Sequence, residues 1–178
     1  MDWQLRASVV QTARQACRVP EGVGSEGALI AEDDTETLRM SRVVPAPQAK
    51  VFRAWTEPEL MKRWWSIGEG WTTSTAEVDL RVGGRYSLLN HHDGGDELKI
   101  TGEFQAIEPP RRLVYTWRFP GSLPVESLVT VEFHQHEAGT EVVVKHERSP
   151  KAMGPGAIAG WNAALARLAT FLAIQQNT

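Results

Sequence analysis

The hydrophobic pattern changes its period once along this chain, and that change constrains the fold more than any other feature. Between residues 37 and 147, apolar residues recur at every second position in seven separate segments, which is typical of strands with one apolar and one wet face. From residue 157 to 175 the apolar spacing becomes three and four, which predicts one long amphipathic helix. The sequence therefore predicts an α+β domain with a seven-stranded antiparallel sheet and a long C-terminal helix.

The predicted elements follow one another with short connections. The alternating segments are 38–44, 77–82, 85–88, 98–106, 113–119, 129–134 and 141–147. Two short helices are predicted after the first strand, within residues 45–65, because Pro47 suits a first helical turn and Pro58 suits the start of a second helix. Gly154, Pro155 and Gly156 are predicted to separate the last strand from the C-terminal helix.

The widths of these elements predict a cavity. Seven strands about 4.8 Å apart form a sheet roughly 30 Å wide, whereas one helix with its side chains is only about 10–12 Å across. The sheet is therefore expected to curl around the long helix in a helix-grip fold, with Gly83, Gly84 and Gly102 as bend points. A curled sheet that grips one helix encloses space unless large side chains fill it.

Strand parity and a cluster of tryptophans select the candidate binding residues. Apolar walls with a few polar groups are typical of small-molecule sites, and aromatic residues that point inward would supply such walls. The alternative is that the same aromatics fill the core, and that the tryptophans after the first strand plug the end of the sheet instead of forming a lid. The ten candidates are Trp65, Trp71, Tyr86, Leu88, Phe104, Tyr115, Trp117, Phe133, His146 and Trp161.

Composition excludes several other functions. The net charge is −3 over 178 residues, which removes the electrostatic basis for binding nucleic acid. Cys17 is the only cysteine, so neither an internal disulfide nor a cysteine zinc site is expected. His134 and His136 share the wet face of a strand without a third strong ligand, and no metal or cofactor is predicted.

No apolar run is long enough to span a membrane, and a soluble, cytoplasmic protein is expected.

Residues 45–172 carry a resemblance to a known family. The segments PAPQAKVFRAWTEPELMKRWW (45–65), EVDLRVGGRY (77–86) and GEFQAIEPPRRLVYTW (102–117), followed by the pairs 139–140 (GT) and 160–161 (GW), occur in this order. In this combination the chain resembles the START-like superfamily, also called SRPBCC, and within it the type that activates the ATPase of the ninety-kilodalton heat-shock protein. The resemblance implies a helix-grip fold and a site between the sheet and the C-terminal helix.

Three functions follow as hypotheses. The first is non-enzymatic binding of a small hydrophobic or aromatic ligand. The second, implied by polyketide cyclases among the relatives, is a cyclase or hydratase in which His146, Tyr86 or Tyr115 directs proton transfer. The third is a chaperone-interacting module that stimulates an ATPase in the stress response, as a monomer or a homodimer. Residues 1–36 are expected to form a flexible extension before a domain at 37–178, because PEGVGSEG (20–27) is typical of a linker.

Overall fold

The computed structural model describes residues 34–121 and 125–175. Their strands form one antiparallel sheet in the order β1-β7-β6-β5-β4-β3-β2. Residues 1–33, and with them Cys17 and most of the predicted extension, lie outside the described residues. The strands are β1 (Thr35–Val44), β2 (Trp71–Val78), β3 (Arg85–His92), β4 (Glu97–Glu108), β5 (Arg112–Trp117), β6 (Ser127–His136) and β7 (Gly139–Pro150).

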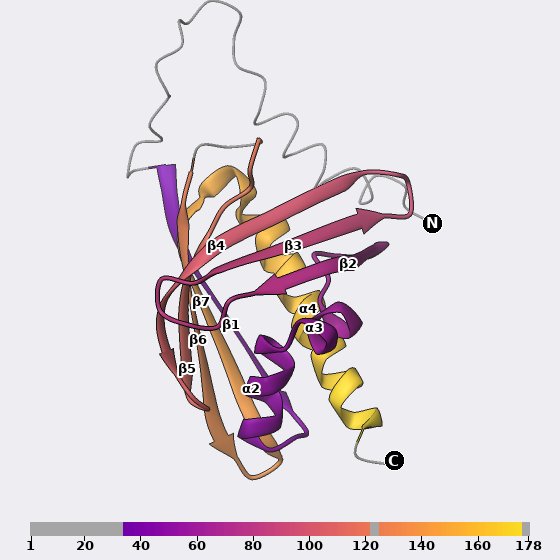
Figure 1. The fold of residues 1–178 in the computed structure, drawn as a ribbon, viewed down its shortest axis with the longest axis vertical. Helices are drawn as coiled ribbons and strands as arrows, with labels where there is room; N and C mark the ends of the chain where they lie inside the picture. Colours follow the sequence, from indigo (N-terminus) through magenta and orange to yellow (C-terminus); the bar gives the residue numbers. More distant parts are fainter. Residues whose placement is uncertain (1–33, 122–124, 176–178) are drawn as a thin grey trace, which may run out of the picture.

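The helices lie on the concave face of this sheet. Two short helices, α2 (Gln48–Thr56) and α3 (Pro58–Trp64), follow β1, and a 3₁₀ turn, η3 (Lys151–Met153), leads into the long helix α4 (Gly154–Ile174). Figure 1 shows the sheet curving around α4, with α2 and α3 packed beside its C-terminal half. The predicted helix-grip fold is confirmed.

The sheet bends where β4 changes partner. Residues 97–103 of β4 pair with β3, whereas pairing with β5 begins at Phe104, opposite Tyr115. At the bend, the backbones of β4 and β5 approach so closely that a Cβ on Gly102 would lie 1.8 Å from the carbonyl oxygen of Thr116. Only glycine fits such a close approach. Gly102 therefore lies at a bend of the sheet, as predicted.

Several strand ends differ by a few residues from the sequence predictions, and two further differences have a clear physical cause. The second strand is β2, Trp71–Val78, and the predicted strand over 77–82 is wrong because Leu80 and Val82 lie in the turn before β3, 42% and 64% exposed. The alternation of apolar and polar residues misled the prediction, since the backbone at Leu80 and Val82 is not paired with a neighbouring strand. Helix α4 begins at Gly154, with Pro155 in its first turn, where the missing N–H of proline removes no helical hydrogen bond.

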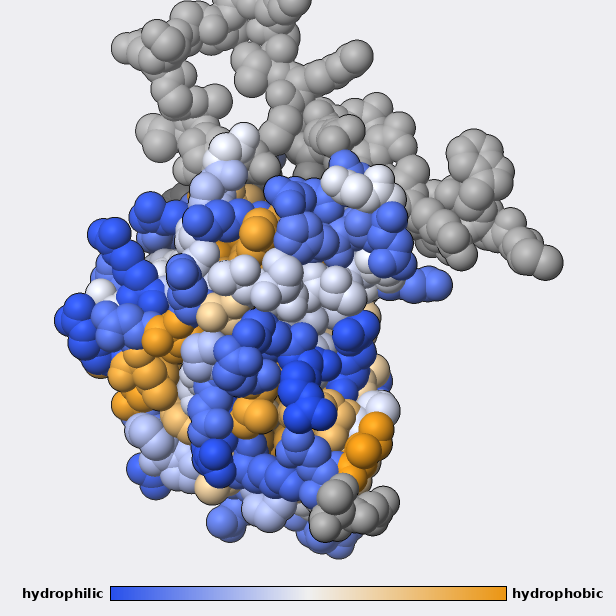
Figure 2. All heavy atoms as spheres, turned by 45° about the vertical axis from the view of Figure 1, so that its right-hand side comes forward, coloured by the Kyte–Doolittle hydropathy of each residue, from blue (hydrophilic) through white to orange (hydrophobic). Residues whose placement is uncertain are grey.

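Helix α4 buries one stripe against the sheet. Trp161, Leu165, Leu168 and Leu172 are at most 5% exposed. Together with η3, this helix has the length and the apolar composition of a membrane-spanning helix. The core helix of a globular domain can have the same length and composition. Figure 2 shows a mainly hydrophilic surface on which apolar residues form separate patches. We therefore interpret α4 as the helix gripped by the sheet.

Candidate functional site

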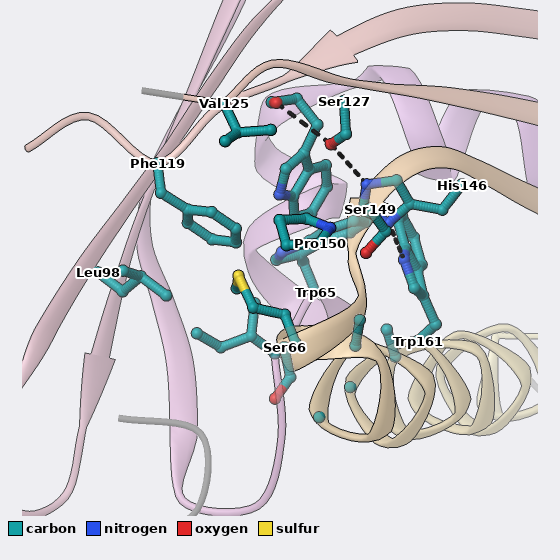
Figure 3. A pocket seen from close by; sticks show the side chains of 17 residues that line it. Trp65, Ser66, Leu98, Phe119, Val125, Ser127, His146, Ser149, Pro150 and Trp161 are labelled. Carbon is teal, nitrogen blue, oxygen red and sulfur yellow. Dashed lines mark hydrogen bonds between the residues drawn. The ribbon is translucent and has the colours of Figure 1, made fainter. Parts of the chain in front are cut away.

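An apolar cavity of about 100 Å³ lies between the first turns of α4 and the sheet. We call it the outer cavity; Figure 3 shows the side chains that surround it. It is partly enclosed, and aliphatic and aromatic groups dominate its wall. The residues that line it include Trp65, Ile67, Leu98, Trp117, Phe119, Val125, Ser127, His146, Pro150, Met153, Ala157 and Trp161.

His146 is the central polar group of this wall. The Nε1–H of Trp161 donates to His146 Nδ1 at 3.1 Å. Because an indole nitrogen can only donate, Nδ1 must be the unprotonated nitrogen, and the proton of the neutral imidazole sits on Nε2. His146 Nε2–H therefore donates to Ser127 Oγ at 2.7 Å, and the Ser127 hydroxyl donates to the carbonyl of Trp117 at 3.3 Å. Both ring nitrogens are satisfied by the protein (Figure 3).

Burial keeps this imidazole neutral. His146 is 4% exposed, and the rings of Trp117 and Trp161 lie 5.8 and 6.1 Å from its ring. Desolvation in these surroundings lowers the pKa of His146 to about 4, because the charged form is the one that needs water. A second proton would also place an N–H against the Trp161 donor, so the charged form is disfavoured by geometry as well.

A second, much smaller space lies between the sheet and the short helices α2 and α3. This inner cavity measures about 20 Å³, and Tyr86, Leu88, Phe104 and Tyr115 contribute to its wall. The volume suffices for about one water molecule. Trp65 and Trp117 line both cavities, so these two indoles form the partition between them.

The two tyrosine hydroxyls are held by protein groups. Tyr86 donates to the carbonyl of Thr116 at 2.8 Å, and Tyr115 accepts from Trp55 Nε1 at 3.3 Å. Burial raises the pKa of Tyr86 well above its usual value and also raises that of Tyr115. Both phenols therefore remain protonated at any physiological pH.

The structure divides the ten predicted residues into three groups. Trp65, Trp117, His146 and Trp161 line the outer cavity, while Tyr86, Leu88, Phe104 and Tyr115 line the inner one, as described above. Trp71 and Phe133 border neither cavity. Trp71 packs beside His92, with ring centroids 5.1 Å apart, and Phe133 packs against Phe52 and Trp55.

Trp64 and Trp65, from the tryptophan cluster that follows β1, contribute in different ways. Trp64 is fully buried and donates from Nε1 to the carbonyl of Ala54 at 2.8 Å, so it fixes α3 to α2. Its neighbour Trp65, 5.2 Å away between ring centroids, forms the wall of the outer cavity. The first of these residues is packed between α2 and α3, and the second borders the outer cavity.

Sequence reasoning missed several residues of the outer cavity. Ser127 could have been found, because it continues the inward parity of Val129 and Val131 by one step along β6. Phe119 carried the same signal, because it continues the parity of Tyr115 and Trp117 in the predicted segment 113–119, although it lies beyond the end of β5. Val125 and Met153 carried none, since they lie outside the strands and their positions depend on how loops close around the start of α4. Within residues 34–121 and 125–175, no group of three or more histidine, cysteine or acidic side chains is placed to bind a metal.

These features define a class of protein: a helix-grip domain with an apolar cavity between its sheet and its long helix. Residues 45–173 match the family described as activator of Hsp90 ATPase homolog 1-like protein. The chain belongs to this family, and the resemblance noted in the sequence is confirmed. No curated protein matches the chain.

Solved structures of bacterial proteins share the fold. A protein from Chromobacterium violaceum is 29% identical, with 75% of this chain and 94% of that chain covered and a TM-score of 0.71. A protein from Nitrosomonas europaea is 24% identical over 84% of this chain and 100% of that one, with a TM-score of 0.70. An AHSA1-like protein from Aeromonas hydrophila is 23% identical over 79% and 94%, with a TM-score of 0.67.

Proposed function

We propose that this protein binds a small apolar or aromatic molecule in the outer cavity. The observation that supports the proposal is an unfilled, largely apolar space of about 100 Å³ beside His146 and Trp161. Apolar cavities of this kind remain dry, and an engineered cavity of about 150 Å³ binds benzene. An empty apolar cavity lowers stability, and a ligand that fills it restores the missing contacts.

The volume limits the ligand to about one ring inside the cavity. Small-molecule sites usually measure about 300–1,000 Å³, so a larger ligand would need to extend through the open side. Burying about 150 Å² of apolar surface at roughly 25 cal/mol per Å² contributes about 4 kcal/mol. Because association also costs translational and rotational freedom, a ring alone is expected to bind with a dissociation constant of about 1 mM at best, and additional groups would strengthen binding.

The polar groups of the interior support binding more than proton transfer. A general base needs a free nitrogen or oxygen within reach of its substrate, but both nitrogens of His146 are bonded to Ser127 and Trp161. The hydroxyls of Tyr86 and Tyr115 are bonded to Thr116 and Trp55. Both nitrogens of His146 and the hydroxyl proton of Tyr86 are thus used to hold the wall together, while Tyr115 acts as the acceptor for Trp55.

Titration with toluene tests the proposal, with amide chemical shifts of the ¹⁵N-labelled protein as the readout. We expect shifts that saturate and that cluster at the start of α4, around Trp161 and at His146. Native mass spectrometry of the purified protein would reveal any molecule that it carries from the cell. The absence of saturable shifts with toluene, together with a protein free of bound molecules, would contradict the proposal.

Two substitutions on the same helix supply a matched control. Ala157 lines the cavity, so Ala157→Leu should fill it and weaken toluene binding by at least about tenfold, or about 1.4 kcal/mol. Ala159 is exposed and borders no cavity, so Ala159→Leu should leave binding unchanged. Equal binding by both variants would place the ligand elsewhere.

Family membership favours a second candidate, stimulation of a chaperone ATPase. The family's description names an activator of the Hsp90 ATPase, and the match covers residues 45–173 of this chain. We expect both activities in the cytoplasm. Steady-state ATP hydrolysis by the purified chaperone, measured with and without this protein, tests the candidate; an unchanged rate at saturating protein would exclude it.

A further inference from the structure

Two tryptophans of the partition differ in their hydrogen bonding from three other buried indoles, those of Trp55, Trp64 and Trp161. Trp55 donates to Tyr115, Trp64 to the carbonyl of Ala54, and Trp161 to His146. In contrast, the Nε1 atoms of Trp65 and Trp117 are buried and have no hydrogen-bond partner among the described residues. Buried donors without a partner are rare in native structures, and each one calls for an explanation.

The two unpartnered donors lie in the same wall. The rings of Trp65 and Trp117 are 5.9 Å apart between centroids, and both line the outer and the inner cavity. Figure 3 shows Trp65 among the side chains around the outer cavity. The rings around them accept hydrogen bonds only weakly. Each Nε1 atom has almost no accessible surface of its own, so a ligand oxygen would reach it through a small shift of the indole and would then supply the acceptor that the protein lacks.

The charge of the wall restricts the kind of acceptor. Among the described residues, no lysine, arginine, aspartate or glutamate lines the outer cavity, and His146 cannot offer a free donor because both its nitrogens are engaged. An anion would lose its hydration without gaining a cation as partner. A neutral oxygen acceptor needs only the N–H groups that the two indoles present.

From this arrangement we propose that the ligand is a neutral aromatic or apolar molecule with a carbonyl or ether oxygen, which accepts a hydrogen bond from Trp65 or Trp117. Aryl ketones, esters and lactones have this chemistry. The inference rests on the proposed function, because it assumes that the outer cavity is occupied. It adds that the site selects oxygen-bearing ligands over pure hydrocarbons and over carboxylates.

Three one-ring probes of similar shape separate these classes: acetophenone, α-methylstyrene, in which a methylene replaces the carbonyl oxygen, and benzoate. One net hydrogen bond should make acetophenone bind about three- to tenfold more tightly than α-methylstyrene, and benzoate should bind most weakly. In the ¹H–¹⁵N spectrum, acetophenone should move the indole Nε1–H signal of Trp65 or Trp117 downfield, whereas α-methylstyrene should not.

Substitution to phenylalanine assigns the signals and checks the donors. Trp65→Phe and Trp117→Phe should each remove one indole signal, and the variant that lacks the bonding donor should bind acetophenone and α-methylstyrene equally. Trp71→Phe, which lies away from the cavity, should keep the preference. Should the variants fail to fold, the indole shifts of the unchanged protein still decide the question.

The outcomes separate this inference from the function on which it rests. Equal affinity for acetophenone and α-methylstyrene, without an indole shift, would overturn the acceptor preference and leave apolar binding standing. Tightest binding of benzoate would overturn the neutral acceptor. Failure of all three probes and of toluene to bind would overturn both proposals.

Discussion

The interior of this domain has two regions that differ in what covers them. Under α2 and α3, which we call the covered region, Val51, Trp64 and Phe133 are at most 1% exposed, and the inner cavity found there measures about 20 Å³. Beside the first turns of α4, in what we call the open region, a single helix faces the sheet and the outer cavity remains. The comparison indicates that the space under the curved sheet is filled by side chains where α2 and α3 cover it. Where α4 alone faces the sheet, space for a ligand remains.

The largest effect is expected from a truncation in the covered region. Phe133→Ala should lower the free energy of unfolding by about 3–5 kcal/mol, because the phenyl ring packs against Phe52 and Trp55 and its removal leaves a cavity. Urea unfolding followed by circular dichroism measures the loss. Phe133 does not border the outer cavity, so the folded variant should keep the toluene-induced shifts around Trp161 and His146, even if toluene also enters the new cavity; loss of those shifts would show that the two regions are coupled.

A pH-dependent loss of stability should come from the open region. The pKa of His146 is lowered to about 4 in the folded state, against about 6.5 in an unfolded chain. The unfolded chain therefore takes up the proton first, and stability falls as the pH drops below about 6.5 and continues to fall towards 4. Between pH 7 and 5 this contribution amounts to about 2 kcal/mol.

Replacing the imidazole separates the contribution of His146 to the pH dependence of stability from the contribution of the carboxylates. His146→Gln should flatten the dependence of the unfolding free energy on pH between 7 and 5 by about 2 kcal/mol, whereas His136→Gln, at an exposed position, serves as the control. If both variants retained the full pH dependence, the buried His146 would not be its source.

The hydrogen bond between Ser127 and His146 should have a smaller effect. Ser127→Ala leaves the Nε2–H of His146 buried without an acceptor, and such a loss lowers stability by about 1–3 kcal/mol. Chemical denaturation at pH 7.5 gives the value. Thr130→Ala, on the same strand but on its other face, provides a comparison that removes a hydroxyl without touching the cavity.

The sequence predicted the fold well and the cavity only in part. Alternation and the change to helical spacing depend on local geometry, so the sheet, the helices and the inward positions of Trp117, His146 and Trp161 could be predicted. The same rule failed at Leu80 and Val82, where a turn imitates alternation without a paired strand. Parity also could not tell Phe133, which is fully packed, from Trp117, which borders the cavity, because that difference depends on whether α2 and α3 cover the position.

Two methionines, one in each region, give the sharpest test of the comparison. Met61 on α3 is 5% exposed, so Met61→Ala should lower stability by about 2–5 kcal/mol. Met153 lines the outer cavity and is only half-buried, so Met153→Ala should lower stability by less than about 1 kcal/mol. Because the shorter side chain widens the outer cavity, Met153→Ala should also bind the two-ring probe naphthalene more tightly than the unchanged protein does. A large loss of stability at Met153, or unchanged affinity for naphthalene, would show that the open region is as firmly packed as the covered one.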